Sequence, residues 1–252
     1  MILIAHLRWG TVAVLTCAVA AYATGIKNDK KDNPKPAAAQ MVDSGSFGVF
    51  IRGKRVVTET FSVQQENGIS TVKSHLQEIG STATGQKSEL QMTGTGELVR
   101  YEWTDGSGSL VVTPKDEFLL ERITTPSSSK PAEQPFLMPN TSAILDNNFF
   151  IHRAVLAWRY LATNCHTTGG TLTCQQGPVE FGVLVPQDRT SMRVRMELAG
   201  REKIAIRGVE RELLRINLKG EAFAWSLWVD EKDQFKLMRV AIADDNTEVV
   251  RD

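Results

Sequence analysis

The chain has 252 residues, 42% of them hydrophobic, and equal numbers of basic and acidic side chains, 29 of each. That length suits one large β domain or two small ones, and the hydrophobic content is enough for a buried core. The balanced charge leaves no basic excess to attract nucleic acid and no run of like charge for a membrane surface, which argues against both partners.

The first 23 residues have the pattern of an export signal. A short polar start precedes an almost entirely apolar stretch, residues 9–20, and a small-x-small cleavage pattern ends at Ala23. Cleavage there predicts a periplasmic or secreted protein of the bacterial envelope, close to the membrane but not spanning it. One alternative is an uncleaved anchor, although the apolar stretch is shorter than the roughly 20 residues of a spanning helix. Another is lipid attachment at Cys17, which a preceding threonine disfavours.

Residues 24–44 are predicted to be a disordered linker, because charged residues, prolines and alanines follow one another without apolar periodicity. Residues 45–252 are predicted to form a single β-rich domain. Asn67 and Gly68 give the clearest hairpin signal, since a type I′ turn needs positive φ at both central residues. The strands predicted in the first half are 46–52, 55–66, 69–79, 87–93, 97–104, 109–113 and 117–124.

Residues 125–145 are predicted to be an irregular insertion, because four prolines interrupt them and proline cannot donate to a strand ladder. A single helix is predicted over residues 147–162, from apolar side chains at helical spacing. His152, Arg153 and Arg159 lie toward its other side. This helix is the one evident element able to cover a curved sheet, so we expect it to be mostly buried there.

Two cysteines remain beyond the signal segment, Cys165 and Cys174. An even number in an exported chain favours a disulfide, which would stabilise a loop of this length by about 3 kcal/mol. The alternative is a metal pair with His166, but adjacent Cys and His side chains are poorly placed to bind one ion. No other metal or cofactor motif occurs, so we expect neither group.

The strand pattern then returns. The segment 222–229 is apolar or small on both faces, so both faces must be covered. The helix can cover one, and the other needs further sheet, the proline-rich insertion or a bound apolar ligand. The strands predicted in this half are 179–185, 190–198, 202–207, 213–219, 222–229 and 235–243.

We therefore consider a hydrophobic groove lined by aromatic side chains, beside the alternative of an ordinary two-sided core without a ligand. The candidate lining residues are Phe61, Trp103, Phe150, Trp158 and Trp225.

Three segments, GSFGVF at 45–50, DNNFF at 146–150 and WSLWVD at 225–230, resemble exported bacterial half-barrel proteins of the lipoprotein-carrier type (LolA/LolB-like), including uncharacterised families. The resemblance implies a mainly β fold, in which a curved antiparallel half-barrel or barrel-like sheet carries one helix in or across its concave side. It also implies non-enzymatic binding of an apolar ligand, such as a lipid, or of a lipidated protein. This chain departs from the pattern in having one clear helix and a long proline-rich insertion.

Two other functions fit the sequence. An envelope assembly protein could pair an exposed sheet edge with another chain. A hydrolase could assemble its site from distant residues, with His152 as a base, although the nucleophile elbow and the helical metal motif are missing from the sequence.

Overall fold

The computed structural model describes residues 39–128, 130–242 and 246–252. The predicted signal peptide, residues 1–23, lies outside the described residues, as does most of the predicted linker. The predicted end of the linker, at residue 44, is wrong. Residues 40–44 pair with the second strand and so belong to the sheet.

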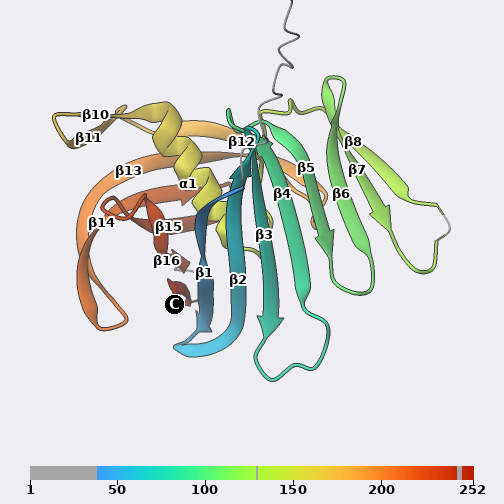
Figure 1. Cartoon of the computed structure of the whole chain (residues 1–252), viewed down its shortest axis with the longest axis horizontal. Helices are drawn as coiled ribbons and strands as arrows, with labels where there is room; N and C mark the ends of the chain where they lie inside the picture. The colour runs from blue at the N-terminus through green and yellow to red at the C-terminus, as the bar shows by residue number, and fades with distance from the viewer. Residues whose placement is uncertain (1–38, 129, 243–245) are drawn as a thin grey trace, which may run out of the picture. The chain divides into compact units, whose positions relative to one another are not determined.

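One sheet of 15 strands contains nearly all the regular structure of the described residues (Figure 1). Its first half is a meander in which each strand pairs antiparallel with the next. At the second turn Asn67 and Gly68 have φ values of 50° and 78°, as a type I′ hairpin requires. The strands of this half are β1 (Gln40–Ile51), β2 (Lys54–Glu66), β3 (Ile69–Glu78), β4 (Gln86–Thr93), β5 (Leu98–Thr104), β6 (Ser109–Lys115), β7 (Phe118–Thr124) and β8 (Ala132–Phe136).

The second half of the sheet follows the helix in the chain, except for β9 (Ala143–Ile144), which precedes it, and a separate two-stranded hairpin comes directly after the helix. The hairpin consists of β10 (Cys165–Thr168) and β11 (Thr171–Cys174). The remaining strands are β9 (Ala143–Ile144), β12 (Val179–Val185), β13 (Thr190–Ile206), β14 (Val209–Lys219), β15 (Ala224–Asp230), β16 (Lys236–Ile242) and β17 (Thr247–Arg251).

A buried ion pair joins the first strand to the last. β1 pairs with β2 on one side and with β17 on the other, so both lie in the middle of the strand order. Arg251 donates to both carboxylate oxygens of Asp43, at 2.6 and 3.0 Å, and to the Ser44 carbonyl at 2.9 Å. Its guanidinium also lies 5.1 Å from the centre of the Phe61 ring. The two halves of the sheet are therefore held together at its centre.

β13 is longer than the sequence predicts. The segments 190–198 and 202–207, predicted as two strands, form one strand that is bent by a bulge between Leu198 and Gly200. Gly200 has a φ of 130°, which is open to glycine because it has no Cβ. The two segments are one strand because the bulge bends the backbone and the pairing with β14 then continues.

The helix α1 (Ile151–Asn164) lies against the concave side of the curved sheet (Figure 1). The sheet is open, since its strand order ends at β8 and β9. The predicted fold class, a mainly β protein with one helix on the concave side of a curved antiparallel sheet, is confirmed as an open sheet and not a closed barrel. The helix begins four residues later than predicted, however, because residues 147–150 form the loop that enters it.

The prediction of an irregular insertion over residues 125–145 is wrong in two places, where β8 and β9 form. β8 contains Pro135, which is tolerated because β8 is an edge strand and pairs with β7 alone. β9 has two residues and pairs in parallel with β12. Strands this short carry too little periodicity to be recognised in a sequence.

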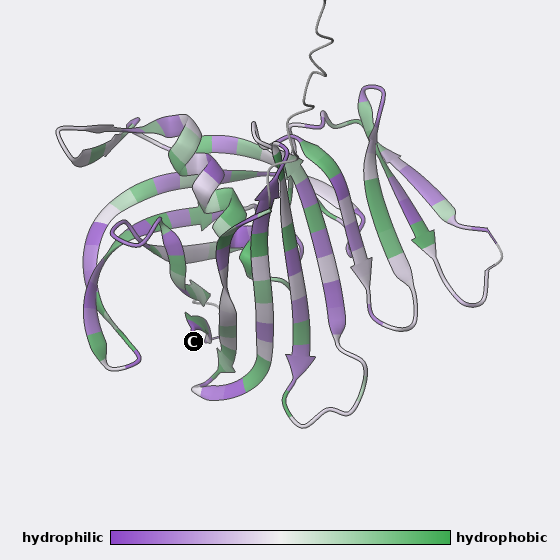
Figure 2. Ribbon diagram, in the orientation of Figure 1, coloured by the Kyte–Doolittle hydropathy of each residue, from purple (hydrophilic) through white to green (hydrophobic). Residues whose placement is uncertain are grey.

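Both faces of β15 are covered. Leu227 and Val229 belong to the large hydrophobic cluster around α1, whereas Trp228 belongs to a second cluster with Ile206 and Leu213. Neighbouring residues of a strand point to opposite faces, so the second cluster lies on the convex face. Figure 2 shows this alternation of hydropathy along the strands. On the convex face, Ile206 and Leu213 of the β13–β14 hairpin and Met238 of β16 pack around Trp228.

The central ion pair leads to a prediction for stability. Replacing Arg251 by Met should leave the Asp43 carboxylate buried without its partner, and should lower the free energy of unfolding by about 3–5 kcal/mol. Urea denaturation followed by circular dichroism measures this loss. The double variant Asp43→Leu/Arg251→Met should lose much less than the sum of the two single variants. Additive losses would show that the two side chains do not stabilise each other.

Candidate ligand-binding groove

The start of α1 is capped by a carboxyl group from another part of the chain. Glu59, on β2, is fully buried, and its Oε2 accepts a hydrogen bond from the Phe150 N–H at 2.6 Å. Its Oε1 accepts from the Ile151 N–H at 3.2 Å and from the Ser74 hydroxyl at 2.7 Å. The first N–H groups of a helix have no partner within it, and they favour a negative group nearby. Glu59 therefore fixes the position of α1 on the sheet.

Arg153 holds the loop that precedes the helix. Its guanidinium donates to three backbone carbonyls, those of Asp146 at 2.6 Å, Phe149 at 2.7 Å and Asn147 at 3.1 Å. Burial lowers the pKa of Arg153 to about 10, so it stays charged at neutral pH. The predicted position of Arg153 on the polar side of the helix is wrong, because these buried carbonyls accept the hydrogen bonds that water would otherwise accept.

Two of the predicted lining residues contact this buried cation. The Arg153 guanidinium lies 4.6 Å from the centre of the Phe150 ring and 4.5 Å from that of Trp225. Trp225 in turn stacks on Phe223, with ring centres 4.2 Å apart. Cation–π contacts of this kind stabilise a desolvated guanidinium. Phe150 and Trp225 therefore serve the packing of α1.

A second group of buried polar side chains surrounds Asp146. Its carboxylate accepts hydrogen bonds from the Tyr101 hydroxyl and the Gln187 amide. His152 is fully buried, and its Nδ1 accepts from the Asp146 backbone N–H at 3.3 Å. Burial lowers the pKa of His152 to about 4, so the ring is neutral. This placement gives His152 no access to a substrate, and the prediction that it points away from the core is wrong.

Glu121, on β7, is buried, and neither of its carboxyl oxygens has a hydrogen-bond partner among the described residues. It lies in the same row of the sheet as Tyr101, two strands away. Burial raises the pKa of Glu121 to about 7, although the charge of Arg189 offsets part of that effect. Burial likewise raises the pKa of Glu59 to about 7. Both residues occupy inward-facing positions of their strands, a signal that alternation alone could have revealed.

Two apolar grooves flank the opposite, C-terminal half of α1. The first, which we call the inner groove, has a volume of 220 Å³ and lies between the helix and the β4–β5 region. Its apolar lining includes Leu90, Met92, Leu98, Val155, Trp158 and Ala162. The second, which we call the hairpin groove, has a volume of 410 Å³ and lies between the helix, β1 and the β10–β11 hairpin. Its apolar lining includes Val42, Trp158, Leu161, Ala162, Leu172 and Phe235.

Trp158 and Ala162 line both grooves. The indole of Trp158 is half-buried, and its N–H donates to the Phe235 carbonyl at 2.8 Å. This bond fixes the ring between the two grooves with part of its surface open. Val155, two turns before Ala162, is also half-buried, so the open face of the helix is a continuous apolar stripe.

Of the five predicted lining residues, Trp158 alone lines these two grooves. Phe61 and Phe150 are buried, and Phe61 stacks on Phe47 with ring centres 4.8 Å apart. Trp103 is half-buried on β5, and its N–H donates to the Gln86 side chain at 3.1 Å. The sequence therefore identifies one aromatic residue of the candidate site.

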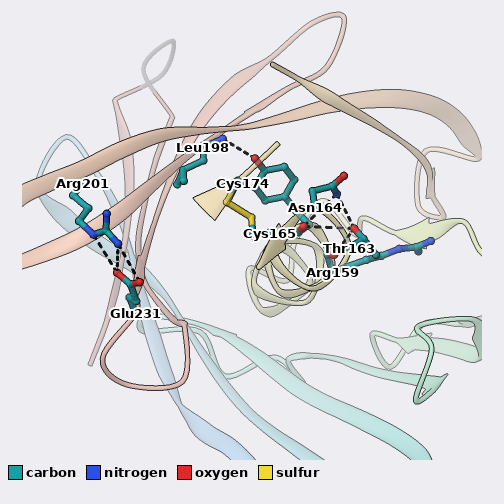
Figure 3. The surroundings of a disulfide bond; sticks show 9 residues. Arg159, Thr163, Asn164, Cys165, Cys174, Leu198, Arg201 and Glu231 are labelled. Atoms are coloured by element: carbon teal, nitrogen blue, oxygen red, sulfur yellow. Dashed lines mark hydrogen bonds and ion pairs between the residues drawn. A yellow bond between two sulfur atoms is a disulfide. The ribbon is translucent and has the colours of Figure 1, made fainter. Parts of the chain in front are cut away.

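The end of α1 is anchored on both sides, as Figure 3 shows. Cys165 directly follows the helix and forms a disulfide with Cys174, opposite it in the β10–β11 hairpin. The predicted disulfide is therefore confirmed, and the alternative of a metal pair with His166 is wrong. The Tyr160 hydroxyl accepts a hydrogen bond from the Leu198 N–H at 2.9 Å, next to the bulge in β13. These contacts hold the walls of the hairpin groove.

The described residues lack two further features that would point to other sites. In that part of the chain, no three His, Cys, Asp or Glu side chains are grouped as metal ligands. Nor does any helix within those residues combine the length and the apolar character needed to cross a bilayer.

A scan against protein-family models finds no match, and a search of curated proteins finds none. Among solved structures, the chain is similar to the crystal structure of a β-barrel-like protein of the domain of unknown function DUF1849 from Brucella abortus. The two share 5% sequence identity and a TM-score of 0.47, over 82% of this chain and 93% of that chain. A likeness at this level carries no conclusion about ligand or activity. The relation to LolA and LolB stays a prediction.

The helix cap leads to a second prediction. Glu59→Ala should leave two helix N–H groups and the Ser74 hydroxyl without their acceptor, and should lower the free energy of unfolding by about 2–3 kcal/mol. Glu59→Gln keeps one oxygen acceptor and should lose less. Chemical denaturation of both variants measures the difference. Equal losses, or a loss below that of an exposed Glu210→Ala control, would contradict a capping role.

The raised pKa of Glu121 leads to a prediction about pH. Between about 4.5 and 7 the unfolded chain ionises this carboxyl and the folded protein keeps it protonated. Folding therefore takes up a proton, and the contribution of Glu121 to stability is lost as the pH rises through about 7. Glu121→Gln should gain stability relative to the wild type from pH 5 to pH 8, by at most about 1.4 kcal/mol per pH unit.

Thermal unfolding of the wild type and Glu121→Gln from pH 5 to 8 tests this directly. Neutral His152, with its lowered pKa, affects stability in the opposite direction. Its contribution cancels when the two proteins are compared at each pH. An exposed Glu210→Gln variant is the control. A constant difference between wild type and Glu121→Gln across the range would show that Glu121 has an ordinary pKa.

Proposed function

We propose that this protein is a non-enzymatic envelope protein that binds a single apolar chain along the open face of α1. The observation that carries the proposal is the half-buried indole of Trp158, which has an apolar groove on each side. Small-molecule sites typically have volumes of roughly 300–1,000 Å³, and the hairpin groove, at 410 Å³, falls in that range. The apolar chain is either a free lipid or the acyl group of a lipidated protein.

The envelope location is part of the same proposal. A disulfide between Cys165 and Cys174 fits an oxidising compartment, and the sequence pattern of residues 1–23 is that of an export signal. The resemblance to lipoprotein-carrier half-barrels supports the same assignment. A helix on the concave side of a curved sheet, with apolar surface left open beside it, is the arrangement that an acyl-binding protein of that type needs.

The two other functions receive less support. Assembly through a sheet edge needs a long unpaired strand, and the edges here are the two-residue β9 and β8, which contains Pro135. A hydrolase based on His152 needs an exposed base, and this ring is buried against Tyr101. Neither alternative has a feature comparable to the grooves beside Trp158.

Trp158→Ala should weaken binding of a neutral alkyl ligand, such as hexadecanol, by about tenfold, because an indole face contributes on the order of 1–2 kcal/mol to a packed apolar contact. Displacement of a fluorescent alkyl probe measures the affinity. Trp103→Ala is the matched control, since Trp103 is also half-buried and hydrogen-bonded but lines neither groove. Equal weakening in both variants would contradict the site, and no binding by the wild type would contradict the function.

Fluorescence gives an independent readout of the same site. A dibrominated octadecanol quenches indoles that it touches. Quenching should persist in Trp103→Phe and should be largely lost in Trp158→Phe. The opposite pattern would place the ligand elsewhere.

A further inference from the structure

Among the described residues, Arg159 is a cation without an acidic partner, on the open face of α1 next to Trp158. Its side chain is half-buried and extends outward from the helix (Figure 3). Burial lowers the pKa of Arg159, with no neighbouring acid to oppose the shift. In the described part of the chain, the guanidinium takes part in no ion pair or hydrogen bond, and its contact is with the Phe181 ring, 5.8 Å away. Most partly buried cations in proteins are paired, so this one is available to a ligand.

Glu180, an acid that lines a groove together with Arg159, is already paired with other arginines. Glu180 accepts hydrogen bonds from Arg195 at 2.9 Å and from Arg193 at 3.3 Å. Those two guanidinium groups hold the pKa of Glu180 below its usual range, and Arg159 plays no part in that shift. Glu180 therefore does not neutralise Arg159.

Arg159 lies where an apolar groove meets a polar one. A third groove, which we call the polar groove, has a volume of 640 Å³ and lies between the proline-rich segment, β12 and β13. Arg159 and Ser142 line both the inner groove and the polar groove. The polar side chains of the polar groove are Thr141, Ser142, Arg159, Glu180, Ser191 and Arg193. An apolar tail in the inner groove would thus place its head group at Arg159.

The size of the inner groove restricts the tail. A cavity of about 150 Å³ holds one benzene molecule. At 220 Å³ the inner groove has room for part of one alkyl chain and not for two chains side by side. A diacyl phospholipid therefore fits poorly, and a single-chain amphiphile fits well.

We infer that the ligand is a long-chain fatty acid, whose carboxylate binds Arg159 while the part of its alkyl chain next to the carboxylate lies in the inner groove against Trp158. This inference rests on the proposed function and specifies its ligand. A guanidinium presents two parallel N–H donors that match the two oxygens of a carboxylate, which makes such pairs strong and specific. The neighbouring Ser142 hydroxyl is a further donor at the same rim.

The test compares hexadecanoate with hexadecanol, which has the same chain and a neutral head, with each ligand kept below its solubility limit. At pH 8 the wild type should bind the acid about tenfold to hundredfold more tightly, as charge-assisted hydrogen bonds predict. Arg159→Gln should weaken hexadecanoate binding much more than hexadecanol binding, so that the preference for the acid is lost. Arg159→Lys, which keeps the charge without the paired donors, should be intermediate. Arg193→Gln is the matched control, because Arg193 lines the polar groove but pairs with Glu180.

The outcomes separate this inference from the proposed function. Equal binding of acid and alcohol, with loss of both in Trp158→Ala, would keep the apolar site and overturn the role of Arg159. A preference for the acid that survives in Arg159→Gln, or is equally lost in Arg193→Gln, would also overturn it. Hexadecyl phosphate binding more tightly than hexadecanoate would overturn the choice of a carboxylate. Failure of the wild type to bind any of the three would overturn both proposals. Thermal unfolding of Arg159→Gln should stay close to that of the wild type, since among the described residues the variant loses no ion pair and no hydrogen bond of the guanidinium, only its long contact with the Phe181 ring.

Discussion

The contact on which the structure depends is the one between Glu59 and the first N–H groups of α1. It joins residues 91 and 92 positions apart in the sequence and lies in a place from which water is excluded. Burying a carboxyl group there is costly, and three hydrogen bonds together with the charge of Arg153 offset that cost. Because a helix is rigid, fixing its first turn on β2 also determines where its last two turns lie.

The two ends of α1 consequently differ in character. At its start, Glu59, Arg153 and the group around Asp146 form a dense buried network in which most polar atoms are hydrogen-bonded. At its end, the Trp158 indole and the Tyr160 hydroxyl each make one hydrogen bond to the second half of the sheet, and the surface between them and the first half stays open. The network places the helix, and the open end carries the grooves. Changes to the ligand site should therefore leave the anchoring of α1 intact.

The sequence predicts the sheet well where its signals are local. Alternation of apolar and polar residues predicts most of the strands. The Asn67–Gly68 pair predicts the turn between β2 and β3, where both residues have positive φ. The start of α1 is misplaced for a non-local reason. Asn147 and Asn148 are good capping residues by type, but the cap comes from Glu59, on a strand far away in the sequence. No pattern near residue 150 could reveal that partner.

The candidate site shows the same limit. Every aromatic side chain on an inward face is a plausible ligand contact until its neighbours are known. The rings of Phe150 and Trp225 contact the Arg153 guanidinium, although the helical periodicity of the sequence predicts that Arg153 faces solvent. Trp158 keeps part of its surface open, and the guanidinium of the neighbouring Arg159 meets no acid among the described residues. Residue type and spacing do not distinguish the two arginines. The Arg153 guanidinium donates to backbone carbonyls, whereas the Arg159 guanidinium has no acceptor among the described residues. An uncompensated cation at the rim of an apolar groove is what a head group would neutralise.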